Sequence, residues 1–393
     1  MVKFSYCPGR RIERFIIVKL KLFRVCLCVF FVMMFSTEAL AKKVDIYIIS
    51  NVAGKKFYGD RKQSLSVMQA LKKFIPEDIG RSSEFDINRL KDLEEEMLGN
   101  KSKSIIIASG GCGIESLRKI KKSIPTYRKE IISVWTGHHI FSDLESNLRY
   151  LDIIALPEYV ITEHIRKAAY KSGTVLVGIP VVPSVIENVA NFESYLSFPM
   201  VSQIPLNDKY LIVFYGGEAV DTRGNNQNIT RDEIRNLALY IEAISNKDNL
   251  KVVLTSGPRT TRREIDDLRS DLTEEKVDFV FFDFQNGVLA YSPLLYLLRE
   301  SSDSQALVTG EATFVVDEVL QVHKKPIYVL KASSMSDAHH RHIEYEKCLG
   351  NVSVLDASSA LYLDNIPDLG SNLSGLRSTG FLIAKAIHPI LRG

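Results

Sequence analysis

The chain has 393 residues, so roughly two to three domains are expected on length alone. With 46% hydrophobic and 25% charged residues, its composition is that of an ordinary globular protein. The formal net charge is only +3, and the body of the chain has no basic stripe interleaved with aromatic residues. We therefore do not expect the protein to bind nucleic acid.

The first 41 residues have the pattern of a secretory signal. Six basic residues at 10–24 precede a short apolar run at 25–35, and Ala39-Leu40-Ala41 follows as a cleavage site. The run is about half the length that spans a bilayer, which favours cleavage after Ala41 over a permanent anchor. We therefore expect export to a periplasm or to the outside, with membrane contact only through this segment. An uncleaved segment would instead anchor the protein.

Cleavage would leave two of the five cysteines, Cys112 and Cys348. They could form a disulfide in an oxidising compartment, but two free buried thiols are the expected state. No neighbouring base marks Cys112 as a nucleophile.

From residue 44 onward, short β-rich runs alternate with amphipathic helical stretches. This alternation predicts parallel sheets covered by helices on both faces. In the first half we expect helices at 63–74 and 114–124 and strands at 44–50, 104–109, 131–136, 153–157 and 175–182. Since α/β folds bind ligands at the carboxyl ends of parallel strands, the residues of interest there are Gly111, Gly113, His138, His139 and Glu158.

An irregular segment at 191–208, with Pro199 and Pro205, is expected to be a linker between two domains. The second half repeats the pattern, with strands expected at 210–215, 251–255, 277–284, 306–308 and 327–330. A capping box from Thr230 to Glu233 predicts the start of a helix. The predicted division is a signal at 1–41, a first domain at 42–198, a second at 209–368, and a C-terminal helix within 369–393 that packs back on the first domain.

Residues 304–331 form the clearest predicted βαβ unit. A strand runs into Thr309, Gly310 and Glu311, a helix follows, and a second strand begins after Pro326. Free N–H groups at such a helix start form an anion site, and glycine lets a phosphate approach the backbone closely. Glu318, further along the helix, could then accept hydrogen bonds from a ribose. The alternative is an ordinary βαβ element with a solvated Glu318.

Other strand ends of the second half predict the same ligand. Gly216 and Gly217 allow a close backbone approach, and Arg259 offers a bidentate fork for phosphate oxygens. Together the strand ends predict a nucleotide-diphosphate site made by Gly216, Gly217, Ser256, Arg259, Thr260, Thr309, Gly310, Glu311 and Glu318.

Two runs, 254–260 and 292–311, with Lys325-Pro326 beyond them, resemble the mitochondrial-fission protein family of the elongated-mitochondria type. That family has a serine–arginine–threonine turn and a threonine–acidic–serine turn before a helix. The resemblance covers nearly all of residues 44–390 at low identity. The chain departs from the family pattern at Gly310 and Glu311, at Ala312 in place of a serine, and in one extra residue before Pro326.

The family is similar in organisation to GT-B glycosyltransferases. The resemblance therefore implies a GT-B-like α/β fold, with two Rossmann-like parallel-sheet domains facing across a cleft. It also implies a nucleotide-sugar donor as co-substrate in the second domain, with Glu318 on the ribose and no cofactor. No metal is expected, because the histidine run at 337–342 is interrupted by Arg341 and has no assured partner ligands.

On the acceptor side, a general base must lie on the first domain and face the cleft. His138 and His139 are the first candidates and Glu158 the second, with a structural role for either histidine as the alternative. Three function classes stay open: a glycosyltransferase acting on an unknown acceptor, a non-catalytic GT-B-like secreted binding or interaction protein, and a two-lobed periplasmic binding protein. Export favours the second class, since a bacterial periplasm normally lacks nucleotide sugars.

Overall fold

The computed structural model describes most of the chain beyond residue 42. The described residues are 43–50, 58–100, 102–124, 130–138, 140–180, 192–217, 219–220, 226–301, 303–359, 366–367, 369 and 379–392. The predicted signal and His139 lie outside them. Among these residues no helix has the length and apolar character needed to cross a membrane.

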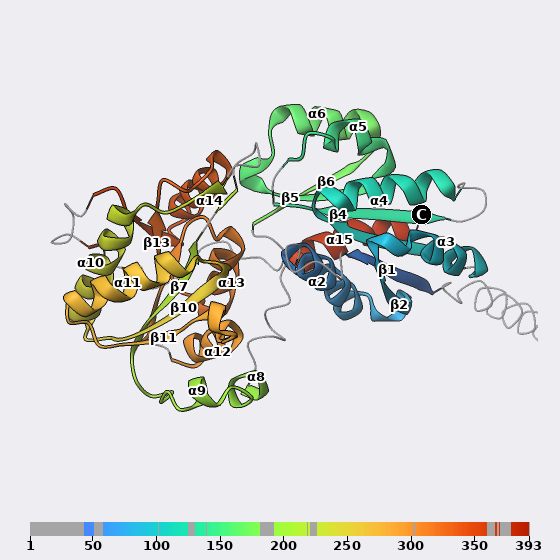
Figure 1. The fold of residues 1–393 in the computed structure, drawn as a ribbon. Coiled ribbons are helices and arrows are strands. Elements are labelled where there is room, and N and C mark those ends of the chain that lie inside the picture. Colours follow the sequence, from blue (N-terminus) through green and yellow to red (C-terminus); the bar gives the residue numbers. More distant parts are fainter. Residues whose placement is uncertain are drawn as a thin grey trace, which may run out of the picture.

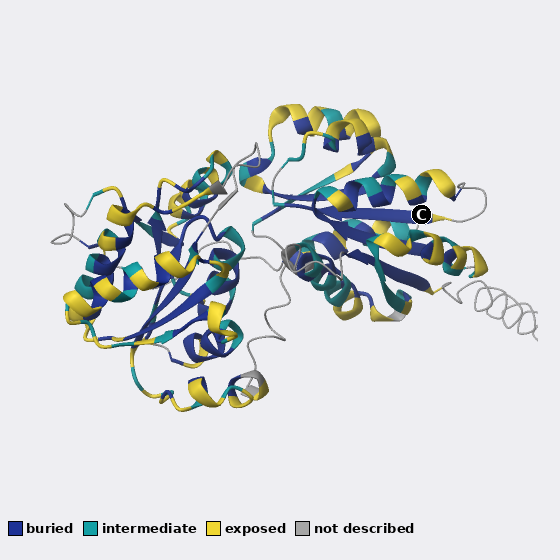
Figure 2. Cartoon of the chain, viewed as in Figure 1, coloured by how far each residue is buried: buried dark blue, intermediate teal, exposed yellow. Residues whose placement is uncertain are grey.

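Each half of the chain forms a parallel six-stranded sheet flanked by helices (Figure 1). The strands are largely buried, and the outward faces of the helices are exposed (Figure 2). Parallel strands that are covered on both faces are rich in isoleucine and valine, which explains the short continuous apolar runs in the sequence.

The first sheet has the strand order β2-β1-β3-β4-β5-β6. Its strands are β1 (Val44–Ser50), β2 (Ile79–Asp86), β3 (Ser104–Ser109), β4 (Ile131–Thr136), β5 (Ile153–Pro157) and β6 (Val175–Ile179). Its main helices are α2 (Tyr58–Phe74), α3 (Leu90–Gly99), α4 (Gly110–Ser123), α5 (Leu144–Asn147) and α6 (Glu163–Ser172). The sequence did not predict β2. This strand lies at the edge of the sheet, and its residues after Ile79 are half-buried or exposed, so it has no continuous apolar run.

The second sheet has the strand order β11-β10-β7-β12-β13-β14. Its strands are β7 (Tyr210–Gly217), β10 (Lys251–Arg259), β11 (Phe279–Phe282), β12 (Gln305–Thr309), β13 (Ile327–Lys331) and β14 (Val352–Asp356). Its helices include α10 (Arg231–Asp248), α11 (Arg262–Glu274), α12 (Tyr291–Glu300), α13 (Thr313–His323) and α14 (Asp337–Cys348). The capping box at Thr230 is confirmed, since Thr230 N donates to Glu233 Oε2 at 2.8 Å and Glu233 N donates to Thr230 Oγ1 at 3.3 Å.

The expected linker is only partly irregular. It contains two short helices, α8 (Phe192–Leu196) and α9 (Pro199–Ser202). Tyr195 and Val201 are buried in the core that β7 shares with α12, and the Tyr195 hydroxyl donates to the Ile204 carbonyl at 2.7 Å. The expectation of an irregular linker is therefore wrong for this part, because its apolar side chains complete the core of the second domain.

The C-terminal helix α15 (Thr379–Arg392) returns to the first domain, as predicted. Ile383 and Ile387 are buried in the same core as Val67 and Leu71 of α2. This packing closes the first domain with the last segment of the chain (Figure 1).

The two domains meet at the carboxyl ends of their strands. Lys62, near the start of α2, lies 3.4 Å from Glu318 of α13. Tyr159, directly after β5, packs against His342 of α14 with ring centroids 4.9 Å apart. Two Rossmann-like domains that face each other, with the last helix on the first domain, confirm the predicted GT-B-like fold.

Cys112 and Cys348 are free thiols, and both are exposed. The expected burial is wrong, because each cysteine lies at a solvent-facing position of its helix, α4 or α14.

Candidate functional site

The second sheet has its topological switch between β7 and β12, where doubly wound folds bind ligands. β7 ends at Gly216 and Gly217, and Gly216 N donates to Thr309 Oγ1 at the end of β12 at 2.8 Å. The next helix, α13, has Ala312 at its N-cap and no side-chain cap. Its first-turn N–H groups therefore give this edge a partial positive charge.

The carboxylate of Glu311 fills the space beside Gly216. A Cβ added to Gly216 would lie 2.5 Å from Glu311 Oε1 and 3.0 Å from Thr309 Oγ1. Glu311 is 1% exposed, and neither of its oxygens has a hydrogen bond of ordinary geometry to a described residue. Burial raises the pKa of Glu311 from 4.5 to about 7, although Thr309 and, more weakly, Arg259 act to lower it. The anion site thus contains an acid of its own, and that acid changes charge near neutral pH.

Gly310 does not present its backbone to a ligand in this structure. Its N–H donates to the Leu330 carbonyl at 2.8 Å. A Cβ added there would lie 2.6 Å from Met335 Sδ. Glycine is needed at this position because β13 and Met335 approach closely, so the predicted close approach of a phosphate is not available here.

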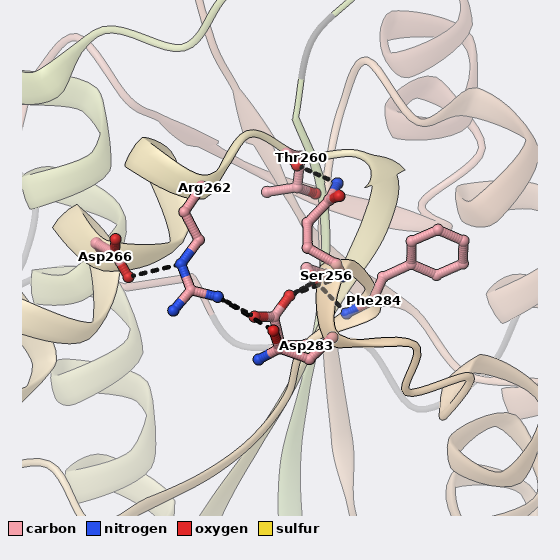
Figure 3. Close-up of polar contacts among 8 residues, drawn as sticks. Ser256, Thr260, Arg262, Asp266, Asp283 and Phe284 are labelled. Carbon is pink, nitrogen blue, oxygen red and sulfur yellow. Dashed lines mark hydrogen bonds and ion pairs between the residues drawn. The ribbon is translucent and has the colours of Figure 1, made fainter.

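Ser256 and Thr260 shape the loop that follows β10 (Figure 3). Ser256 Oγ accepts from the Phe284 N–H at 2.8 Å, and the Thr260 carbonyl accepts from the Gln285 side chain at 2.7 Å. Both Ser256 and Thr260 are buried. They hold the end of β10 against the turn after β11, so the role that the structure shows for them is a supporting one.

Arg259 is the one exposed residue of the predicted nucleotide-diphosphate site. It ends β10, is exposed, and makes no ion pair with any residue that the structure describes. Its guanidinium is close enough to Glu311 to lower the pKa of that carboxyl. Gly217 has φ +88°, and a Cβ added there would lie 2.5 Å from Thr260 Cα and 2.8 Å from the Arg259 carbonyl oxygen, so a larger residue does not fit at the end of β7.

Glu318 is fully buried at the domain contact, so the interpretation as a solvated residue is wrong. Lys62 Nζ lies 3.4 Å from its Oε1, and the Tyr291 hydroxyl donates to its Oε2. Lys62 Nζ also lies over the rings of Tyr291 and Phe314, 5.5 Å and 5.4 Å from their centroids. Burial and the Glu318 carboxylate raise the pKa of Tyr291 well above 10. A ribose could reach Glu318 only after Lys62 moves away.

Asp60, which lies at the same end of α2 as Lys62, was not among the site residues predicted from the sequence. A Cβ added to Gly110, the first residue of α4, would overlap the Asp60 carboxylate. Burial raises the pKa of Asp60 from 3.8 to about 6. A carboxylate with such a pKa is suited to accept a proton near neutral pH. The glycine run that starts at Gly110 indicates a close approach, but only the tertiary structure shows which side chain approaches.

Of the predicted bases, Glu158 and His138 are described. His138 is half-buried and follows β4. Glu158 is exposed, lies 3.5 Å from Arg166, and begins the short 3-10 helix Glu158–Val160, whose Tyr159 contacts the second domain. Glu158 therefore lies close to the domain contact.

Comparison with known proteins found no matching family model and no matching curated protein. Among solved structures, the chain is similar to a putative UDP-N-acetylglucosamine 2-epimerase from Listeria monocytogenes, with 12% identity over 88% of this chain and 96% of that one and a TM-score of 0.47. It is also similar to the UDP-GlcNAc 2-epimerase of Methanocaldococcus jannaschii, with 12% identity over 89% of this chain and 100% of that one and a TM-score of 0.44. MurG of Acinetobacter baumannii is similar at 10% identity over 82% of this chain and 89% of that one, with a TM-score of 0.39. At these identities and scores the likenesses do not bear on what this chain binds.

Proposed function

We propose that the chain is a GT-B-type glycosyltransferase that binds a nucleotide-sugar donor in its second domain. The observation that carries the proposal is the switch point between β7 and β12, where the uncapped start of α13 and the exposed Arg259 lie at the edge that faces the first domain. A helix start and a guanidinium are the groups that bind a diphosphate. The resemblance to the mitochondrial-fission family stays a prediction.

In this proposal the donor binds after the domains separate at Lys62. The diphosphate contacts Arg259 and the first turn of α13, and Glu318, once free of Lys62, accepts hydrogen bonds from the ribose. Glu311 must be protonated or displaced for the diphosphate to approach, because two anions would otherwise share one buried site.

Asp60 is the proposed general base on the acceptor side. The acceptor hydroxyl oxygen forms a bond to the anomeric carbon of the sugar, and the bond from that carbon to the diphosphate oxygen breaks. The hydroxyl proton passes to the Asp60 carboxylate, and the nucleoside diphosphate leaves with its negative charge opposed by Arg259 and α13. With its pKa raised to about 6, Asp60 is mostly ionised and ready to accept a proton at neutral pH.

A second candidate function is a non-catalytic binding protein with the same fold. It is favoured by the burial of Glu318 under Lys62 and by the Glu311 carboxylate beside Gly216, which together fill the predicted donor space.

The experiment that separates the two is titration calorimetry with a panel of nucleotide sugars and nucleoside diphosphates, followed by an assay for diphosphate release. The glycosyltransferase proposal expects one nucleotide to bind and its sugar conjugate to be turned over, at least by slow hydrolysis. Binding without release across an acceptor panel would support the non-catalytic function. The absence of any nucleotide binding, in wild type and in Lys62→Ala alike, would overturn the donor site itself.

A further inference from the structure

Three chemistry-bearing side chains form a buried cluster away from the switch point: Asp317 on α13, and His342 and Glu346 one turn apart on α14. Each offers one ligand atom, and the three atoms lie within 4.8 Å of one another. The side chains are 0%, 0% and 1% exposed. None of them has a role in the proposed transfer reaction.

Two buried atoms of this cluster have no hydrogen-bond partner among the described residues, His342 Nδ1 and Glu346 Oε1. Other atoms of the cluster are hydrogen-bonded: His342 Nε2 lies 2.8 Å from Asp317 Oδ1, and Asn351 Nδ2 donates to Glu346 Oε2 at 2.7 Å. An unsatisfied buried polar atom costs about 1–3 kcal/mol. Burial and the Asp317 carboxylate raise the pKa of Glu346 to about 7, although His342 acts to lower it.

We propose that Asp317, His342 and Glu346 bind one divalent transition-metal ion, with Zn²⁺ as the representative ion. One imidazole nitrogen and two carboxylate oxygens are a donor set that suits Zn²⁺, whereas Ca²⁺ and Mg²⁺ prefer oxygen ligands alone. The ion would replace the proton between His342 and Asp317 and give Glu346 Oε1 a partner. Tetrahedral Zn²⁺ requires ligand atoms roughly 3.3 Å apart, so the three ligand atoms, which lie within 4.8 Å of one another, would adjust their separations when the ion binds.

The first domain covers this cluster through Tyr159. Its ring lies 4.9 Å from that of His342, and its hydroxyl is buried without a partner among the described residues. Burial, followed by the charges of Asp317 and Glu346, raises the pKa of Tyr159 well above 10. Tyr159 is thus placed to donate to a carboxylate that holds the ion, or to complete its coordination, and the ion would join the two domains.

Sequence spacing alone could not identify this donor set. In the run at 337–342, His339 accepts from Ser336 N at 3.1 Å and caps α14, and only His342 is fully buried. Its partners lie 25 residues earlier and four residues later, on two helices that meet only in the fold.

The test uses the tag-free full-length chain, stripped with a chelator and titrated with Zn²⁺ by calorimetry, with bound metal measured by mass spectrometry after dialysis. Wild type is compared with His342→Ala, with Glu346→Gln, which keeps the side-chain volume, and with His340→Ala on the same helix as the matched control. Because Cys7, Cys26 and Cys28 could bind additional Zn²⁺, the readout is the difference between wild type and each variant.

We expect His342→Ala to lose one Zn²⁺ per chain, Glu346→Gln to bind that ion at least tenfold more weakly, and His340→Ala to match wild type. If His342→Ala does not fold, the folded Glu346→Gln variant decides the question. Equal Zn²⁺ binding in wild type and Glu346→Gln would overturn the proposal, as would a cluster that binds Ca²⁺ in preference to Zn²⁺. The result does not depend on glycosyl transfer, because no nucleotide or activity enters the measurement.

Discussion

At the switch point of each sheet, an acidic side chain lies beside the start of a helix. In the first domain it is Asp60, which lies against Gly110 of α4 with its pKa raised to about 6, and it remains partly accessible. In the second domain it is Glu311, which precedes α13, is 1% exposed and has its pKa raised to about 7. Both shifts arise mainly from burial, but only Asp60 can exchange a proton with a bound molecule without a rearrangement. In the proposed reaction, the same local arrangement would supply the base in the first domain and control access to the donor site in the second.

The largest expected effect is on Asp60. If Asp60 is the base, Asp60→Asn should lower the rate of sugar transfer about a hundred- to ten-thousandfold, with nucleotide affinity unchanged. The wild-type rate should fall as pH drops through about 6, because the carboxyl becomes protonated. Steady-state rates with the donor found in the nucleotide panel measure both effects. Glu158→Gln tests the alternative base. If the transfer rate fell in Glu158→Gln and stayed normal in Asp60→Asn, the base would be Glu158.

Glu311→Gln should stabilise the protein at high pH. The pKa of Glu311 is raised on folding from 4.5 to about 7, so the folded state resists ionisation, and wild-type stability falls as pH rises from about 4.5 to about 7. Glutamine does not ionise, so the variant should gain about 2–3 kcal/mol at pH 8 and almost nothing at pH 4. Denaturant unfolding at the two pH values measures the difference. An equal gain at both values would mean that a packing change, and not the charge, is responsible.

Arg259→Ala should weaken nucleotide binding about ten- to a hundredfold, because a charge-assisted hydrogen bond to the diphosphate is lost. Arg259→Lys should recover only part of this loss, since lysine keeps the charge but not the bidentate geometry. Calorimetric titration provides both values, and Arg263→Ala, another exposed arginine of the second domain, is the control. Wild-type affinity in Arg259→Ala would place the diphosphate away from β10.

The smallest expected effect is on stability, at Gly110. Gly110→Ala forces a side chain into a backbone with φ +71° and against the Asp60 carboxylate, which should cost about 1–2 kcal/mol. Gly173→Ala is the matched control, because Gly173 has φ +75° and open space around it. Both variants should lose stability, but only Gly110→Ala should also lower the transfer rate, since only there is Asp60 displaced. A normal rate in Gly110→Ala would separate Asp60 from the chemistry.

The residues at the ends of the strands could be predicted from the sequence, but their contacts could not. The sequence indicated that Gly216, Gly217, Arg259 and Thr309 lie at strand ends, and the structure brings Gly216 and Thr309 within 2.8 Å. It could not show that Gly216 makes room for Glu311, because this contact spans 95 residues of chain. Glycine permits a close approach, and the sequence does not say whether a ligand or another side chain makes it.

By itself the sequence determined the alternation of strands and helices, the capping box at Thr230, and the amphipathic character of the last segment. These features depend on local hydrophobic periodicity and on contacts between residues three or four apart. The tertiary structure alone decided the edge strand β2, the burial of Glu318 by Lys62, the raised pKa of Asp60, and the cluster of Asp317, His342 and Glu346. Each of these depends on groups far apart in the chain, and burial, which shifts pKa values and leaves polar atoms unpaired, exists only once the domains have folded and met.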